Sequence, residues 1–103
     1  MDDLQNKDKK LIEIVNKLAN SLTGQSIEFV DYWESDLCAT GFIIRNKLIY
    51  VSTWDTRSSN ELICYCELEL LINKKEQTYK LYKSFDRIDL ETLIVEVANF
   101  IIS

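Results

Sequence analysis

The chain has 103 residues, of which 47% are hydrophobic and 28% are charged, and its formal net charge is −5. This length fits a single domain, residues 1–103, and leaves no room for two. No apolar run approaches the roughly 18–20 residues that a transmembrane helix needs. The start, Met1-Asp2-Asp3, is acidic where a signal peptide is basic. We therefore expect a soluble, cytoplasmic protein.

Several classes of active site are excluded by missing residue types. The chain has no histidine, so it cannot build a histidine-based triad, general base or metal site. Gly24 and Gly41 are the only glycines, too few for a phosphate-binding loop or a dinucleotide-binding fingerprint. The absence of proline is typical of long elements joined by brief turns.

The negative charge is concentrated in the middle of the chain. Residues 28–73 hold eight acidic residues against three basic ones, and 8 − 3 accounts for the whole net charge of −5. A negative field repels phosphate, so we expect no direct binding of nucleic acid. It attracts basic proteins and speeds their encounter. The alternative is that the charge only keeps a small domain soluble.

An amphipathic helix is predicted at each end of the chain. Residues 3–23 repeat apolar side chains at helical spacing, with Asp2 or Asp3 as the N-cap and Gly24 after the end. Its polar face carries Lys7, Lys9, Lys10, Glu13 and Lys17. Residues 89–102 form the closing helix, with Asp89 as N-cap and an apolar surface wide enough to be buried on more than one side.

Five strands are predicted between the helices, at residues 26–33, 37–45, 48–55, 61–72 and 77–85. A turn at Asn46-Lys47 would pair Arg45 with Leu48, Phe42 with Val51 and Ala39 with Trp54. A turn at Lys74-Lys75 would place Glu69 opposite Lys80. The expected fold is α+β: an N-terminal helix, an antiparallel meander of about five strands and a C-terminal helix, with both helices on one sheet face.

The face of the sheet turned away from the helices has an unusual composition. The even-numbered residues of 61–72 are apolar and are expected to face the helices. The opposite face then collects aromatic residues among carboxylates, namely Tyr50, Trp54, Tyr65, Tyr82, Glu61, Glu67 and Glu69. Aromatic anchors ringed by charges are typical of recognition surfaces. The alternative is a half-exposed face whose rings pack only on their neighbours.

A second candidate contact lies between the first strand and the hairpin. Asp31, Trp33, Glu34 and Asp36 fall within six residues, and no basic residue follows until Arg45. We interpret this segment as a contact loop, which together with Asp55 completes the predicted set of contact residues. The alternative is an ordinary turn with Trp33 packed under the domain.

The cysteines and the paired carboxylates do not predict catalysis. Cys38, Cys64 and Cys66 are expected to be buried as small apolar residues, because three thiols without histidine make a poor zinc site and a cytosolic disulfide is unusual. Glu67 and Glu69 lie on one face about 7 Å apart by strand geometry. So short a chain has few loops with which to build a catalytic cleft. We therefore expect no enzymatic activity, no metal and no cofactor.

The segment from Phe29 to Asp55, FVDYWESDLCATGFIIRNKLIYVSTWD, followed by the acidic alternating strand, resembles the immunity proteins of bacterial contact-dependent growth inhibition systems. The resemblance implies a cytosolic inhibitor that binds, one to one, the C-terminal toxin domain of a large CdiA-like effector. Many such toxins are nucleases, often acting on tRNA, with basic grooves. The implied mechanism is inhibition by covering the basic active site or the substrate-binding surface of the toxin, with a free form that is monomeric.

Two other functions fit the same sequence. Type III-like secretion chaperones are also small, acidic, cytoplasmic α/β proteins, and they are generally dimers that bind an effector segment. A pocket for a small ligand under a curved sheet is a third interpretation, and nothing polar in the predicted core favours it.

Overall fold

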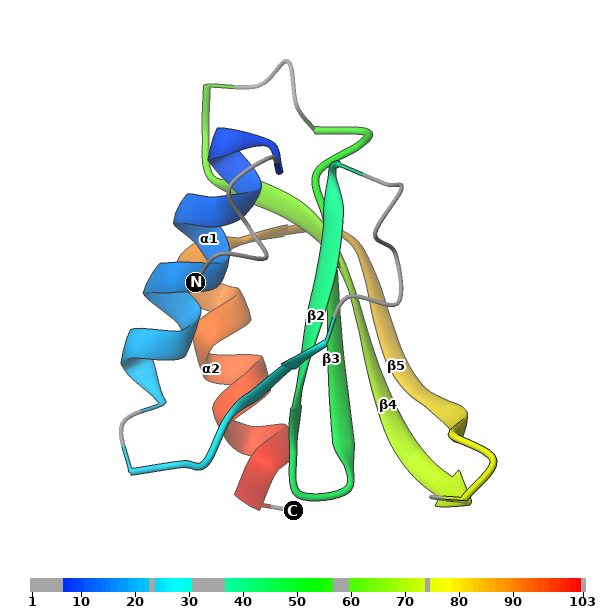
Figure 1. The fold of residues 1–103 in the computed structure, drawn as a ribbon. Helices are drawn as coiled ribbons and strands as arrows, with labels where there is room; N and C mark the ends of the chain where they lie inside the picture. The colour runs from blue at the N-terminus through cyan, green and yellow to red at the C-terminus, as the bar shows by residue number, and fades with distance from the viewer. Residues whose placement is uncertain (1–6, 23, 31–36, 57–59, 74, 103) are drawn as a thin grey trace.

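The computed structural model describes residues 7–22, 24–30, 37–56, 60–73 and 75–102. Five antiparallel strands follow one another across the sheet in chain order, and both helices lie on one side of it (Figure 1). The elements are α1 (Lys9–Ser21), β1 (Glu28–Val30), β2 (Ala39–Ile44), β3 (Lys47–Ser52), β4 (Ile63–Asn73), β5 (Thr78–Asp89) and α2 (Leu90–Ile102). The predicted α+β meander is confirmed.

Helix α1 begins later than the sequence predicts. Residues 7 and 8 are not helical, and Asp8 is the N-cap, its carboxylate accepting from the Leu11 amide at 3.2 Å. The same carboxylate accepts from the Thr53 hydroxyl at 3.0 Å, which ties the start of the helix to the end of β3. Lys7 therefore precedes the helix and is buried, not part of its polar face. The proposed caps Asp2 and Asp3 lie outside the described residues.

The β2–β3 hairpin turns one residue earlier than predicted. Ile44 pairs with Lys47, so Arg45 and Asn46 form the turn, with Arg45 at a φ of 59°. The predicted pairs are wrong: Arg45 lies in the turn, and Trp54 lies beyond the end of β3. The remaining corrections to the pairing are Phe42 with Ile49, Thr40 with Val51 and Ala39 with Ser52. The pairing moves by two residues, so the alternation of faces survives.

The β4–β5 pair is longer and less regular than predicted. β5 continues to Asp89, and the register shifts at three places along the pair. One shift lies between Leu68 and Glu69, so that Glu69 faces Leu81 and the predicted Glu69–Lys80 pair is wrong. Ile72, expected to face the core, is largely exposed.

The core lies between the helices and one sheet face. It is built from the inner stripes of α1 and α2 and from alternate residues of the strands; its largest members are Phe42, Leu11, Ile14, Leu18, Ile44, Ile49, Leu68 and Leu93. Cys64 and Cys66 are buried within it as predicted, whereas Cys38 is only half-buried. The Asp89 carboxylate accepts from the Thr92 amide at 3.3 Å, as expected of an N-cap. Within the described residues, no helix is both long and apolar enough to cross a bilayer.

Lys47 fastens the hairpin to the end of α2. Its ammonium donates to the carbonyl oxygens of Phe100 at 2.7 Å and Ile101 at 3.0 Å, where the last turn of the helix leaves carbonyls without intrahelical donors. The β2–β3 turn and the C-terminal end of α2 lie at the same end of the molecule (Figure 1). The hairpin therefore fixes α2 against the sheet.

We predict that Lys47→Met lowers the free energy of unfolding by about 1–2 kcal/mol, because it keeps the apolar stem and removes the charged donor. Urea denaturation monitored by tryptophan fluorescence measures the change. Lys80→Met, at an exposed position on β5, is the matched control and should cost much less. Equal losses in the two variants would contradict this role for Lys47.

Candidate functional site

The candidate site lies on the sheet face turned away from the helices, which we call the open face. On β4 the inward residues Cys64, Cys66 and Leu68 are buried, so the intervening residues Tyr65, Glu67 and Glu69 must point to the open face. The pairing with β3 places Tyr50 directly opposite Glu67 and Leu48 opposite Glu69. Strand alternation and register thus bring these side chains together.

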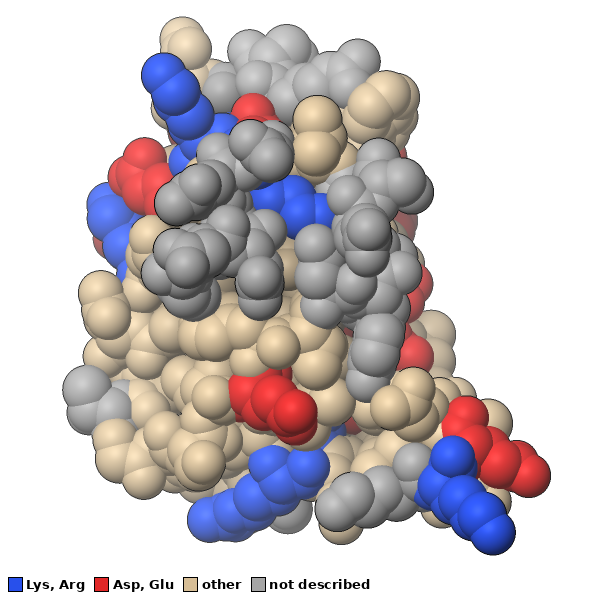
Figure 2. Space-filling view, in the orientation of Figure 1, with Lys and Arg blue, Asp and Glu red and all other residues tan. Residues whose placement is uncertain are grey.

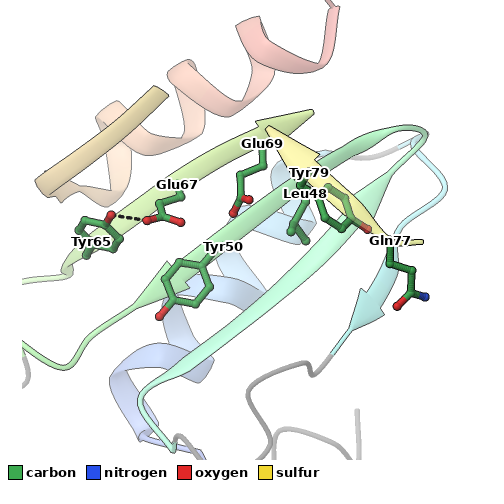
Figure 3. A pocket seen from close by; sticks show the side chains of 7 residues that line it. All are labelled: Leu48, Tyr50, Tyr65, Glu67, Glu69, Gln77 and Tyr79. Atoms are coloured by element: carbon green, nitrogen blue, oxygen red, sulfur yellow. Dashed lines mark hydrogen bonds between the residues drawn. The ribbon is translucent and has the colours of Figure 1, made fainter. Parts of the chain in front are cut away.

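These side chains surround a depression in the open face, which we call the β3–β5 hollow. Its volume is about 490 Å³, and it is lined by Leu48, Tyr50, Tyr65, Glu67, Glu69, Gln77 and Tyr79 (Figure 3). The lining comes from β3, from β4, and from the beginning of β5 with the residue before it. Leu48 is almost fully buried, whereas the tyrosines and glutamates are half-buried and reach solvent. The hollow therefore combines an apolar base with aromatic and anionic walls.

Tyr65 is held in place by two neighbours. Its hydroxyl donates to a carboxylate oxygen of Glu67 (Figure 3), and its ring packs edge-on against Tyr50, with centroids 6.2 Å apart and an interplanar angle of 74°. The hydrogen bond to Glu67 raises the pKa of Tyr65 above the usual tyrosine range, with smaller contributions from burial and from nearby negative charge. Tyr65 therefore stays a neutral donor that orients Glu67.

Glu69 occupies an unfavourable environment for a carboxylate. Burial raises its pKa most, the negative charge of Glu67 raises it further, and so does a side-chain hydrogen bond with Glu67. Within the described part of the chain, neither Glu67 nor Glu69 forms a salt bridge. The hollow thus holds two neighbouring acidic groups without a basic partner from the described residues.

The helix side of the molecule differs from the open face. Figure 2 has the helices on the left and β4 and β5 on the right: Lys and Arg lie among Asp and Glu on the left, and acidic side chains come into sight at the right-hand margin. On α1, Glu13 pairs with Lys17 at 2.9 Å, and Glu96 of α2 lies 3.7 Å from Lys83 of β5. Glu13 and Glu96 therefore have basic partners, whereas the described residues supply none to Glu67 and Glu69.

The structure unites part of the predicted contact set. Tyr50, Tyr65, Glu67 and Glu69 line the hollow together, as expected. Trp54 and Asp55 follow the end of β3 and do not line it, although the Trp54 side chain is 57% exposed. The prediction for Asp31, Trp33, Glu34 and Asp36 lies outside the described residues.

Tyr82 was placed on the wrong face. Its ring packs on Phe100 of α2, with centroids 5.2 Å apart, so it lies on the helix side of the sheet. The cause is the register shift between Leu68 and Glu69, which breaks the simple alternation along β5.

Tyr79 and Gln77 are functional candidates that sequence reasoning missed. Tyr79 pairs with Leu71 on β4, and Gln77 precedes β5 at a φ of 54°. An aromatic residue near the start of the strand predicted at 77–85 was a signal for Tyr79. No comparable signal marks Gln77, because the turn geometry alone brings it to the hollow.

The cysteines offer little reactivity. Burial raises the pKa of the Cys64 thiol to about 12 and that of Cys66 well above its usual value, so both stay protonated and are poor nucleophiles. Among the described residues, no group of three or more cysteine, aspartate or glutamate side chains is placed to hold a metal ion.

Comparison of the chain with protein-family models, with curated proteins and with solved structures finds no match.

We predict that Glu69→Gln raises the stability of the free protein at pH 7. A carboxyl whose pKa is higher in the folded than in the unfolded state loses stability as pH rises through its titration, whereas glutamine does not titrate. The advantage of the variant should therefore shrink as the pH falls toward 4, about the ordinary glutamate pKa. Thermal unfolding across this range measures it, with Glu76→Gln in the exposed β4–β5 turn as control. A less stable variant at pH 7 would contradict the assignment.

We also predict that Tyr65→Phe lowers the free energy of unfolding by about 0.5–1.5 kcal/mol, because Glu67 loses its donor. The variant should also lack a tyrosine that ionises later than an ordinary tyrosine in an alkaline absorbance titration. Tyr82→Phe, which keeps its ring on Phe100, is the control and should retain that late titration. If a late-ionising tyrosine is still seen in the titration of Tyr65→Phe, the hydrogen bond between Tyr65 and Glu67 is contradicted.

Proposed function

We propose that this chain is a cytoplasmic immunity protein that binds and neutralises a basic toxin domain without catalysing any reaction. The carboxylates of the β3–β5 hollow carry the proposal, because they lie beside three tyrosine rings and have no salt bridge to a described residue. Burial and mutual repulsion act on the free site, as the raised pKa of Glu69 indicates. Binding a cationic surface relieves that repulsion, so charge complementarity favours the complex.

The proposed partner is the C-terminal nuclease domain of a contact-dependent growth inhibition effector, bound one to one. A nuclease that acts on RNA needs cations to hold phosphates. Glu67 and Glu69 compete with RNA for the basic side chains of the toxin. Tyr50 and Tyr65 pack against apolar patches of the toxin between those side chains. Inhibition then follows from covering the substrate-binding surface. The resemblance over Phe29–Asp55, together with the net charge of −5, supports this partner.

The direct test begins with the reading frame immediately upstream of the gene. We expect it to encode a very large exoprotein with a short basic C-terminal domain. That domain should arrest growth when produced alone in the bacterial cytosol, and co-production of this chain should restore growth and give a 1:1 complex by light scattering. An upstream product that neither arrests growth nor binds this chain would contradict the proposal.

We predict that Glu67→Lys combined with Glu69→Lys slows association with that toxin domain by about tenfold or more at low salt, since steering by charge sets the encounter rate. Stopped-flow fluorescence measures the rate. Glu13→Lys with Glu91→Lys is the matched control, because it makes the same charge change on the two helices, across the sheet from the hollow. If the association rate falls equally in both double variants, the open face is not the contact surface.

A secretion chaperone remains the second candidate function, and one observation favours it. Val95 and Ile102 are 58% and 80% exposed, and they lie seven residues apart on the outer side of α2. Such a pair suits a dimer that uses the closing helix. Sedimentation distinguishes the two functions: a dimer that dissociates on Val95→Lys would favour the chaperone, and a monomer would favour the immunity protein.

A further inference from the structure

We infer that the β3–β5 hollow is a receptor for one arginine side chain presented by the partner. The inference rests on the proposed function in one respect, namely that the partner is a basic protein. It adds the chemical group that enters the hollow and the residues that receive it.

The charge of the hollow calls for a cation. Glu67 and Glu69 project from alternate positions of one strand into the same space (Figure 3). Both carboxyl groups line the same hollow, and the described residues supply neither with a salt bridge. A single positive group between them can donate hydrogen bonds to both carboxylates. Charge-assisted hydrogen bonds of this kind are about twice as strong as neutral ones.

The aromatic walls favour a flat cation. Tyr50, Tyr65 and Tyr79 line the hollow from three different strands. Tyr50 and Tyr65 are set at 74° to each other, so their rings do not cover one another face to face. A guanidinium group stacks on an aromatic face and donates in its own plane at the same time. An ammonium group has no such plane, which makes arginine a better fit than lysine.

The base and the size of the hollow fit a long side chain. Leu48 is 2% exposed and closes the base, so the methylene stem of an arginine would pack on the partly exposed rings of Tyr50 and Tyr79. A volume of about 490 Å³ gives room for the whole side chain. Two carboxylates are fewer than the ligands that a bound divalent cation normally takes from a protein, and no described group of three is present. The shape and chemistry together indicate a guanidinium on an aliphatic stem.

The test uses the intact chain and a probe that needs no knowledge of the toxin. N-acetyl-arginine methylamide is titrated into labelled protein, and amide and tyrosine ring shifts are followed by NMR. We expect saturable binding in the millimolar range, with shifts confined to residues of the hollow. The citrulline analogue, which has the same shape without the charge, should not bind. The lysine analogue should bind more weakly than arginine.

Variants locate the binding. Glu67→Gln with Glu69→Gln should weaken arginine binding by about tenfold or more, and Glu13→Gln with Glu91→Gln should leave it unchanged. No saturable arginine binding, equal binding of citrulline, lysine binding as tight as arginine, or insensitivity to the hollow variants would each overturn the inference. If the chain binds the arginine probe but does not bind the toxin domain encoded upstream, the arginine site is supported and the immunity function is refuted. If the chain restores growth in the presence of the toxin but does not bind the arginine probe, the immunity function is supported and the arginine site is refuted.

Discussion

The period-two alternation of β4 is the constraint on which both halves of this molecule depend. One set of its side chains, Cys64, Cys66 and Leu68, is buried against the helices, and burial of that set fixes which way the strand faces. The other set, Tyr65, Glu67 and Glu69, is then obliged to form the open face. Slipping the strand by one residue would bury carboxylates in the core, so folding and presentation of the site are enforced by the same apolar contacts.

The fold could be predicted because its signals are local and repeated. The amphipathic spacing in α1 and α2 and the alternation in β4 are each sustained over many residues, and the meander follows from short connections. The hairpin prediction had the wrong turn, yet it assigned Phe42 and Ile49 to the correct face because the error was two residues. Even the start of α1 failed for a local reason, since Asp8 caps the helix in preference to the earlier aspartates proposed for that role.

The site was predicted where alternation holds and missed where it breaks. Tyr50, Tyr65, Glu67 and Glu69 follow from regular strands, and the sequence alone brings them to one face. Tyr82 does not, because a register shift turns it toward Phe100, and such shifts have no reliable sequence signature here. Tyr79 and Gln77 reach the hollow through the same irregular pairing and the turn before β5. Tertiary geometry, not residue type, decided these positions.

The irregular pairing of β5 has a consequence for association between copies of the molecule. β5 is the last strand of the sheet and runs for 12 residues, so its free side is long enough to recruit a strand from another molecule. The register shifts between β5 and β4 bend this edge of the sheet, and Lys80 and Lys83 add positive charge along it. A bent and charged sheet edge is a poor template for the addition of further β-strands, which is the step that leads to amyloid. The register shifts that turn Tyr82 toward α2 thus also help to keep this small protein from polymerising.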